Sequence, residues 1–200
     1  KIKKEASGRQ ARLAPAPRGL FLVYTINNCL KGSGMKVRFF NNPDEEYNLH
    51  DCLIGALASG MWDSFRCAVA FVKASGVSYL SGPLADFSEH SRAEIIAGID
   101  MGGTSLEGLL LLLESLSDHG HLWIFHNESS STFHPKMYVF KNETNAVVVV
   151  GSGNWTEGGL LNNYEAFMEV ECALSDPDAQ KFINEVDSCL DRWSDHKSDF

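Results

Sequence analysis

Residues 65–72, with the sequence FRCAVAFV, form a nearly continuous apolar run of the length of one β-strand. Such a run is typical of a strand that is buried on both faces of a sheet. A second run of this kind, AEIIAGI, occupies residues 93–99. Two strands of this type favour a layered domain, in which helices cover both sides of a sheet.

Strand-like and helix-like segments alternate from Met35 onward. We expect strands at residues 35–40, 65–72, 93–99, 121–125, 133–140, 146–150 and 164–173. We expect helices at residues 49–62, 78–87 and 104–117, and a last helix that opens at the sequence SDPD, residues 175–178. Asn48 and Thr104 are the expected N-caps, and Glu107 stands at the capping-box position relative to Thr104. The alternation predicts an α/β fold with a mixed central sheet flanked by helices.

Residues 1–34 differ in composition from the rest of the chain. They are basic at the start and rich in Ala, Pro and Gly, without amphipathic periodicity. We therefore expect residues 1–34 to be a leader, a tag or a flexible arm, with Met35 as the natural start; a genuine N-terminal arm is the alternative. Residues 35–200 are expected to form one domain.

The composition narrows the functional classes. Hydrophobic residues make up 44% of the chain and charged residues 22%, which is typical of a globular protein. No apolar run is long enough for a membrane helix, and no secretory signal is recognisable. Five scattered cysteines without a CxxC pair argue against a disulfide framework or a zinc ribbon and favour a reducing, cytoplasmic location. With a net charge of −9, binding to nucleic acid would require a local basic patch, a second domain or a partner.

His134 and Lys136 are the first candidate site residues. On a strand, residues two apart point to the same face, so these two side chains should project together. Met137 and Val139 should then point to the other face and pack. Pro135 lacks a backbone donor, which suits the edge or the opening of a sheet better than its centre.

A Gly-Ser-Gly-Asn loop follows the buried strand VVVV. Its glycines, including Gly153, let the backbone approach a ligand closely. Ser152 and the amide of Asn154 can donate to phosphoryl oxygens, and Thr156 begins a segment, TEGGL, whose first amides would also favour an anion. Glu165, on the next expected strand, can accept a hydrogen bond from His134 and so fix its tautomer.

This stretch resembles the phospholipase D superfamily, whose signature is H-x-K-x4-D, then G-S-x-N, then a downstream acid. The matching residues are His134, Lys136, Gly151, Ser152, Asn154 and Glu165, whereas position 141 holds Lys in place of the motif Asp. With this departure and the downstream Glu, the sequence resembles one branch of the superfamily. That branch contains the metal-independent type IIS restriction endonucleases and the phospholipase D-like domains fused to DNA helicases. The sequences at residues 70–77 and 98–105 also resemble that branch.

The resemblance implies a metal-independent, cofactor-free DNA phosphodiesterase that works as a homodimer. Members use two HxK motifs per site, so two copies of this chain should face each other. One His134 would form a phosphohistidine, and the partner's His134 would act as acid and then as base. Lys136 and Asn154 would stabilise the phosphoryl oxygens. A DNA-recognition or helicase domain or subunit is an expected further partner.

Other interpretations of the same features remain open. The chain is alternatively a non-catalytic nucleic-acid-binding or dimerisation module of a helicase or restriction system, or a phosphodiesterase for a lipid or small phosphodiester. Trp155 is either an interface residue or a stacking platform for a base or sugar. The spacing of His119, His121 and His126 fits no usual zinc pattern, so no metal site is expected. The leucines at residues 109–113 are expected in core or dimer packing, and Asp100 lies in a loop that often faces ligands.

Overall fold

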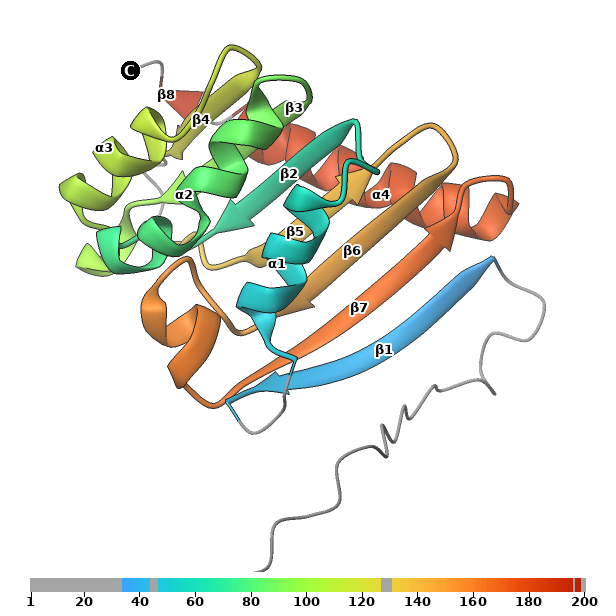
Figure 1. The fold of residues 1–200 in the computed structure, drawn as a ribbon, viewed down its shortest axis with the longest axis horizontal. Coiled ribbons are helices and arrows are strands. Elements are labelled where there is room, and N and C mark those ends of the chain that lie inside the picture. Colours follow the sequence, from blue (N-terminus) through green and yellow to red (C-terminus); the bar gives the residue numbers. More distant parts are fainter. Residues whose placement is uncertain (1–33, 44–46, 127–130, 196, 199–200) are drawn as a thin grey trace, which may run out of the picture.

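The computed structural model describes residues 34–43, 47–126, 131–195 and 197–198. Within them the chain forms one eight-stranded sheet with the strand order β1-β7-β6-β5-β2-β3-β4-β8 (Figure 1). The strands are β1 (Met35–Asn42), β2 (Ser64–Val69), β3 (Arg92–Gly98), β4 (Gly120–Phe125), β5 (Lys136–Lys141), β6 (Asn145–Gly151), β7 (Glu165–Ala173) and β8 (Lys197–Ser198). The expected leader, apart from Gly34, lies outside the described residues.

The sheet is mixed, as the sequence predicts. Strands β2, β3 and β4 are parallel, whereas β5, β6, β7 and β1 follow on one side in antiparallel pairs. The parallel strands are joined by helices α2 (Ala74–Ser88) and α3 (Leu106–Glu114), in the usual manner of crossover connections. Strands β5, β6 and β7 follow each other in the chain, whereas β1, the first strand, pairs with β7.

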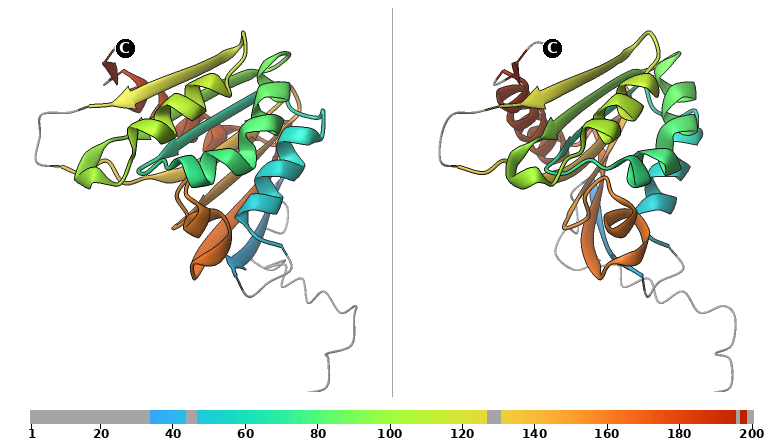
Figure 2. Two further views of the ribbon diagram at one scale, coloured as in Figure 1. Left: turned by 60° about the vertical axis from the view of Figure 1, so that its left-hand side comes forward. Right: turned by 90° about the vertical axis from the view of Figure 1, so that its left-hand side faces the viewer.

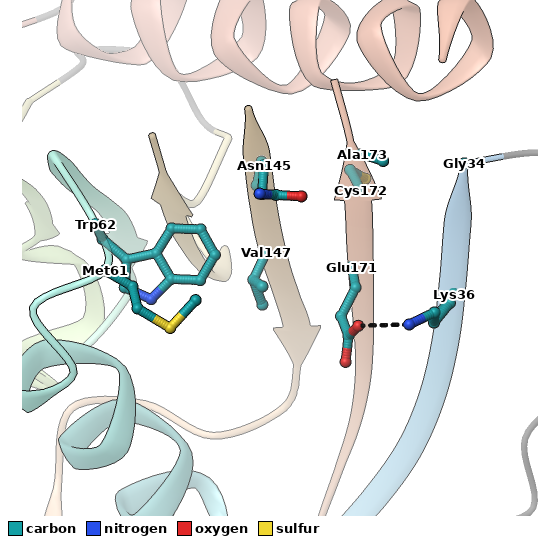
Figure 3. Close-up of a pocket in the computed structure, with 10 residues that line it drawn as sticks. Gly34, Lys36, Met61, Trp62, Asn145, Val147, Glu171, Cys172 and Ala173 are labelled. Atoms are coloured by element: carbon teal, nitrogen blue, oxygen red, sulfur yellow. Dashed lines mark ion pairs between the residues drawn. The ribbon is translucent and has the colours of Figure 1, made fainter. Parts of the chain in front are cut away.

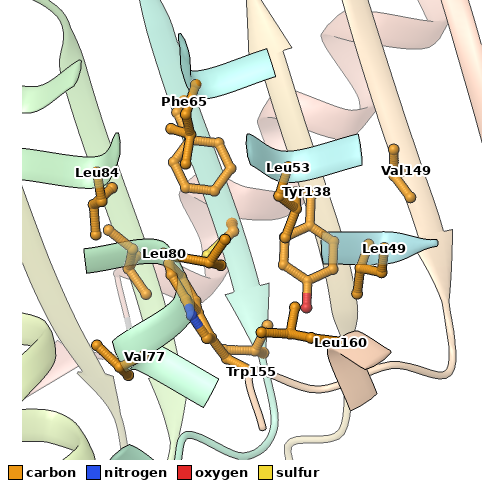
Figure 4. Close-up of a cluster of buried hydrophobic side chains, with 14 of the residues drawn as sticks. Leu49, Leu53, Phe65, Val77, Leu80, Leu84, Tyr138, Val149, Trp155 and Leu160 are labelled. Atoms are coloured by element: carbon orange, nitrogen blue, oxygen red, sulfur yellow. The ribbon is translucent and has the colours of Figure 1, made fainter. Parts of the chain in front are cut away.

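Helices cover both faces of the sheet (Figure 2). α1 (Leu49–Ala58), α2, α3 and the short helical turn η2 (Gly158–Asn162) lie on one face, and α4 (Pro177–Ser194) crosses the other. The larger core lies under α1 and α2 and contains Phe65, Leu80, Tyr138 and Trp155, all fully buried (Figure 4). The smaller core lies under α4. This arrangement is the predicted layered α/β fold.

A charged network joins α4 to the sheet. The Arg66 guanidinium contacts Glu94 at 2.8 Å, Asp187 at 3.2 Å and Asp191 at 2.7 Å. Lys141 pairs with Asp187 at 2.7 Å. Because Glu94 is only 6% exposed, it depends on its arginine partners for the hydrogen bonds that water would otherwise provide. The network therefore fixes where α4 crosses the strands.

One predicted helix cap was assigned to the wrong residue. α3 is capped by Ser105, whose side chain accepts from the Gly108 amide, so Thr104 is not the N-cap and Glu107 does not complete a capping box. The Thr104 hydroxyl instead donates to the Gly98 carbonyl at 2.6 Å and accepts from the Val72 amide at 3.0 Å. The Asn48 cap of α1 and the opening of α4 at SDPD are confirmed.

A shallow cavity of about 420 Å³ lies at the end of the sheet where β7 finishes and β1 begins. Figure 3 shows Trp62 and Met61 on one side and the Lys36–Glu171 ion pair, at 3.7 Å, on the other. The predicted site residues line the opposite end of the sheet, as the next section describes. The cavity is therefore separate from them.

Candidate active site

The predicted site residues come together at one end of the sheet. β5 begins at Lys136, β6 ends at Gly151, and β7 begins at Glu165. The strand register places Lys136 opposite Val69, the last residue of β2, and Gly151 opposite Phe167. The HxK segment, the GSGN loop and Glu165 are therefore at the same edge, although they lie on three different strands.

His134 and Lys136 are in direct contact. The Lys136 ammonium lies 2.7 Å from Nδ1 of His134 and 3.2 Å from Nε2, and it donates to the His134 carbonyl at 3.1 Å. Lys136 is only 7% exposed, whereas His134 is exposed. Burial lowers the pKa of the Lys136 ammonium, and the nearby Glu165 carboxylate partly opposes that shift. A fixed cation thus lies beside an accessible imidazole.

The predicted strand at residues 133–140 starts later than expected. The regular ladder begins at Lys136 because Pro135 has no N–H to donate, although its carbonyl accepts from the Ala70 amide at 2.9 Å. Met137 and Val139 are buried under α4, on the face opposite Lys136, as predicted. His134 therefore lies just outside the sheet, where a substrate can reach it.

Asp100 holds the backbone of the HxK segment through a hydrogen bond. Its Oδ2 accepts from the Phe133 amide at 2.7 Å. The Phe133 ring stacks on Phe125 at 4.0 Å and meets the edge of Trp193 at 5.5 Å. Asp100, which the sequence suggested as a ligand-facing residue, thus acts on the backbone just before His134. Its loop position alone did not indicate that partner.

The GSGN loop is held by several short contacts. Oδ1 of Asn154 accepts from the Phe71 amide at 3.1 Å, so its Nδ2 group is left for another acceptor. Ser152 is exposed, and its hydroxyl oxygen accepts from the Ala166 amide at 3.1 Å, which leaves its O–H proton free to donate. Gly153 is buried, and a Cβ there would collide with Gly159 and Phe167.

Thr156 and Glu165 have partners that the sequence did not indicate. The Thr156 hydroxyl accepts from the Gly159 amide at 3.0 Å and so holds the start of η2. Glu165 is half-buried, and its Oε1 accepts from Nδ2 of Asn163 at 3.2 Å. Within the described residues no hydrogen bond joins Glu165 to His134. The predicted carboxylate–imidazole contact is therefore wrong for this structure, in which the Lys136 ammonium contacts both ring nitrogens.

Trp155 does not present its indole to solvent. It is fully buried in the core beneath α2, with its ring against Phe65 at 6.4 Å (Figure 4). Its backbone pairs with the chain beyond β2, because the Trp155 amide donates to Phe71 and its carbonyl accepts from Lys73. Both predicted roles, stacking platform and interface residue, are therefore corrected to a core role.

The described residues contain neither a metal-binding cluster nor a membrane-spanning helix. In that part of the chain, no three His, Cys, Asp or Glu side chains gather in a way that would hold a metal ion. None of its helices is long and apolar enough to cross a membrane.

Comparison with known proteins identifies the fold. Residues 100–190, which include all four predicted catalytic residues, match the family model described as cardiolipin synthase, PLD-like domain. NucT from Helicobacter pylori superposes with a TM-score of 0.61 at 16% identity, over 83% of this chain and 99% of that one. The chain has a phospholipase D-like fold.

Two further solved structures are similar to this chain. Nuc from Salmonella typhimurium, described as a phospholipase D family member, gives a TM-score of 0.58 at 16% identity over 83% of this chain and 98% of its own. The phosphatidylserine synthase of Haemophilus influenzae gives 0.56 at 14% identity, over 82% of this chain and 40% of that one. No curated protein matches the sequence.

Proposed function

We propose that this phospholipase D-like domain is a metal-independent phosphodiesterase that hydrolyses DNA through a phosphohistidine on His134. The observation that carries the proposal is the contact between an exposed imidazole and a buried ammonium, 2.7 Å apart, at the edge where Asn154 and Ser152 also lie. These groups supply a nucleophile and oxygen-binding donors without a metal ion. The match of residues 100–190 supports the same chemistry.

In this proposal His134 attacks the phosphorus atom, and the bond to the leaving oxygen breaks as the P–N bond forms. The Lys136 ammonium and the free Nδ2 group of Asn154 bind the nonbridging oxygens, whose negative charge they stabilise. Because Lys136 is already buried and in place, little reorganisation is needed in the transition state. Glu165 acts on Lys136 through its charge, which favours the protonated ammonium.

A histidine nucleophile needs a proton donor on the opposite side of phosphorus, beside the leaving oxygen. In the proposal this donor is His134 of a second copy, which protonates the leaving oxygen. It then removes a proton from a water molecule that attacks phosphorus, and the P–N bond breaks to release the first His134. The site is thus completed by a homodimer.

An exposed apolar row near the site supports a partner copy. Phe39, Met168 and Val150 are paired across β1, β7 and β6, and they are 51%, 39% and 47% exposed. They lie on the sheet face that carries α4, because Val150 pairs with Met137 of the core under that helix. Val150 precedes Gly151 directly, so the row reaches the same end of the sheet as the predicted site, on the face opposite the Lys136 side chain. In the proposal, a copy of this chain covers the apolar row and supplies the second His134.

DNA is the proposed substrate, and in the proposal most of the affinity for DNA comes from a partner domain or subunit. The net charge of −9 gives little general attraction for a polyanion. The proposal therefore includes a DNA-recognition or helicase domain or subunit as partner. A cytoplasmic location is part of the same proposal.

A lipid phosphodiester is the second candidate substrate. The matching family model is described as cardiolipin synthase, and phosphatidylserine synthase shares the fold. Either substrate contains a phosphodiester of the same charge, so the test must include both.

The decisive experiment is phosphodiester cleavage in excess EDTA, with bis-nitrophenyl phosphate, plasmid DNA and phosphatidylglycerol vesicles as separate substrates. We expect the parent to turn over the reporter and DNA, and His134→Ala to turn over neither. His90→Ala is the control and should keep the parent activity, because His90 is an exposed histidine just beyond the C-terminal end of α2. An alkali-quenched reaction should show a mass increase on His134, since phosphohistidine is stable in base. Loss of activity in EDTA, or equal activity in His134→Ala, would refute the mechanism. Cleavage of vesicles alone would replace DNA with lipid, and cleavage of nothing would favour the binding-module interpretation.

A further inference from the structure

Phe71 lies two residues beyond the end of β2 and contacts two of the predicted catalytic side chains through its ring. The ring meets the His134 imidazole edge to face, with centroids 5.4 Å apart and planes at 82°. The Lys136 ammonium lies 5.8 Å from the centre of the same ring. Both distances fall within the ranges of attractive aromatic and cation–π contacts. One half-buried ring thus adjoins both the imidazole and the ammonium.

The backbone of Phe71 holds a third predicted catalytic residue. Its amide donates to Oδ1 of Asn154 at 3.1 Å, and its carbonyl accepts from the Trp155 amide at 3.1 Å. An N–H donor identifies the acceptor as the oxygen of the Asn154 amide, so the orientation of this side chain is defined. The Nδ2 group consequently faces away from Phe71. A shift of Phe71 would move Asn154 as well.

Gly103 packs closely against the Phe71 ring. A Cβ atom added at Gly103 would overlap Cδ1, Cε1 and Cγ of that ring, which are the three nearest atoms to it. The backbone of Gly103 is ordinary, with φ −71° and ψ −27°, so alanine is compatible with the conformation itself. The absence of a side chain at position 103 therefore makes room specifically for Phe71.

We propose that Phe71, seated against Gly103, is a positioning residue that holds His134, Lys136 and Asn154 in their reactive arrangement. This inference rests on the proposed function, in which those three groups act on phosphorus. Phe71 itself contacts no reacting atom in this mechanism. Its removal should lower the rate of the chemical step more than it weakens substrate binding, because misplacement by about 1 Å can cost a factor of about 10².

The first test separates positioning from general packing. Phe71→Leu keeps an apolar side chain but loses the aromatic ring, and Phe87→Leu makes the same change in the core beneath α2, where Phe87 is 8% exposed. We expect kcat of Phe71→Leu for bis-nitrophenyl phosphate to fall at least tenfold, with KM within about twofold of the parent. Phe87→Leu should melt earlier but keep the parent kcat below its melting range. Equal kcat in the parent and Phe71→Leu would overturn the proposal.

A double-mutant cycle tests the seat at Gly103. Gly103→Ala should lower kcat about as much as Phe71→Leu, because the new methyl group displaces the ring. In a Phe71→Ala background the same change should have little further effect, since the ring that it displaces is gone. Gly82→Ala, in a part of α2 with open space around it, is the matched control and should keep the parent kcat. Equal losses from Gly103→Ala in both backgrounds would show that the two residues act independently and would contradict the proposal.

The NMR signal of His134 provides a test that does not depend on catalytic activity. The proposal can therefore be tested even if the parent does not cleave any substrate. The ring current of Phe71 should shift the His134 Cε1–H NMR signal, which is assigned by its loss in His134→Gln. We expect that signal to move in Phe71→Leu and Gly103→Ala and to stay in place in Gly82→Ala. An inactive parent with these shifts would remove the proposed function and leave the positioning contact. An unchanged His134 signal in Phe71→Leu would remove the positioning contact.

Discussion

Replacing Lys136 with methionine should stabilise the fold and lower kcat by a factor of about 10²–10³. Methionine keeps an unbranched side chain of similar length but removes the buried charge. Lys136 is 7% exposed, and burial lowers its pKa, which shows that the folded environment disfavours the ammonium. The ammonium is nevertheless kept beside His134, where the proposed mechanism uses it.

The expected gain in stability is modest. Replacing buried charged groups with well-packed apolar ones of similar volume is often neutral or stabilising by about 1–4 kcal/mol when no buried opposite charge is left unpaired. Because Glu165 attracts the ammonium and would lose that partner, we expect the low end, about 1 kcal/mol, or about 2–4 °C in melting temperature for a domain of this size. Loss of one oxygen-stabilising group typically lowers kcat by about 10²–10³.

The pH dependence of the stability difference between Lys136→Met and the parent tests whether the buried charge causes that difference. The folded pKa of Lys136 lies below 10.5, its ordinary value, so between these two values the unfolded chain binds more protons than the folded one. The stability contributed by this group therefore rises with pH in that interval. The advantage of Lys136→Met should be full below the folded pKa and should shrink as the pH rises towards 10.5.

The assay combines thermal melts from pH 7 to pH 10.5 with cleavage of bis-nitrophenyl phosphate in EDTA. Lys181→Met, at an exposed position on α4, is the control and should leave melting temperature and kcat close to the parent values. A lower melting temperature for Lys136→Met at pH 7, or parent-like kcat, would refute the reasoning. A pH-independent difference would show that burial of the charge is not the cause.

Three further changes test the interface, the core and the attachment of α4. Met168→Glu should make a dimer monomeric in light-scattering chromatography, whereas Leu110→Glu, at a 50% exposed position on α3, should not; the reverse result would move the interface to α3. Trp155→Ala should lower the free energy of unfolding by about 3–5 kcal/mol in urea melts, as expected for a core residue, and a loss below 1 kcal/mol would contradict its burial. Arg66→Met should lower the free energy of unfolding by about 3 kcal/mol in the same assay, because it leaves Glu94 with Arg92 alone. Arg92→Met should lower it by less than about 1 kcal/mol, because the Arg92 side chain is 63% exposed. Equal losses from the two changes would count against the network.

Most of the fold was predictable because its signals are local. The buried strands appear in the sequence as apolar runs, and the cap at Asn48 follows from a side chain that accepts a nearby amide. Thr104 was expected to cap α3, but the adjacent Ser105 does so. The contact that decides between them is distant: Thr104 binds Val72 and Gly98 instead, so Ser105 caps α3.

The gathering of the candidate site residues at one edge of the sheet was predictable from the sequence, but their contacts were not. The motif spacing indicated His134, Lys136 and Asn154, because residues at the ends of strands in one sheet meet at its edge. It did not indicate Phe71 or Asp100, whose partners lie 83 and 33 residues away in the chain. Trp155 was misjudged because a tryptophan next to a ligand loop is compatible with either stacking or burial. Its burial depends on α2, which covers it.

Lys141, at the place of the motif Asp, is explained by its position on β5. Lys136 begins that strand at the predicted site and Lys141 ends it, so the two are about 17 Å apart at about 3.3 Å per residue. Lys141 there pairs with Asp187 of α4 at 2.7 Å. The missing Asp therefore removes no group from the site of this chain, and the lysine helps to attach α4.

Restoring the motif residue should consequently do harm rather than good. Lys141→Asp would place a second carboxylate beside Asp187, and we expect a loss of about 1 kcal/mol, or about 2–4 °C in melting temperature, with kcat unchanged within twofold well below the melting range. Lys141→Asn, which removes the cation without adding an anion, should lie between this variant and the parent. A severalfold rise in kcat for Lys141→Asp would show that position 141 does act on the site, and that the distance along β5 does not isolate it.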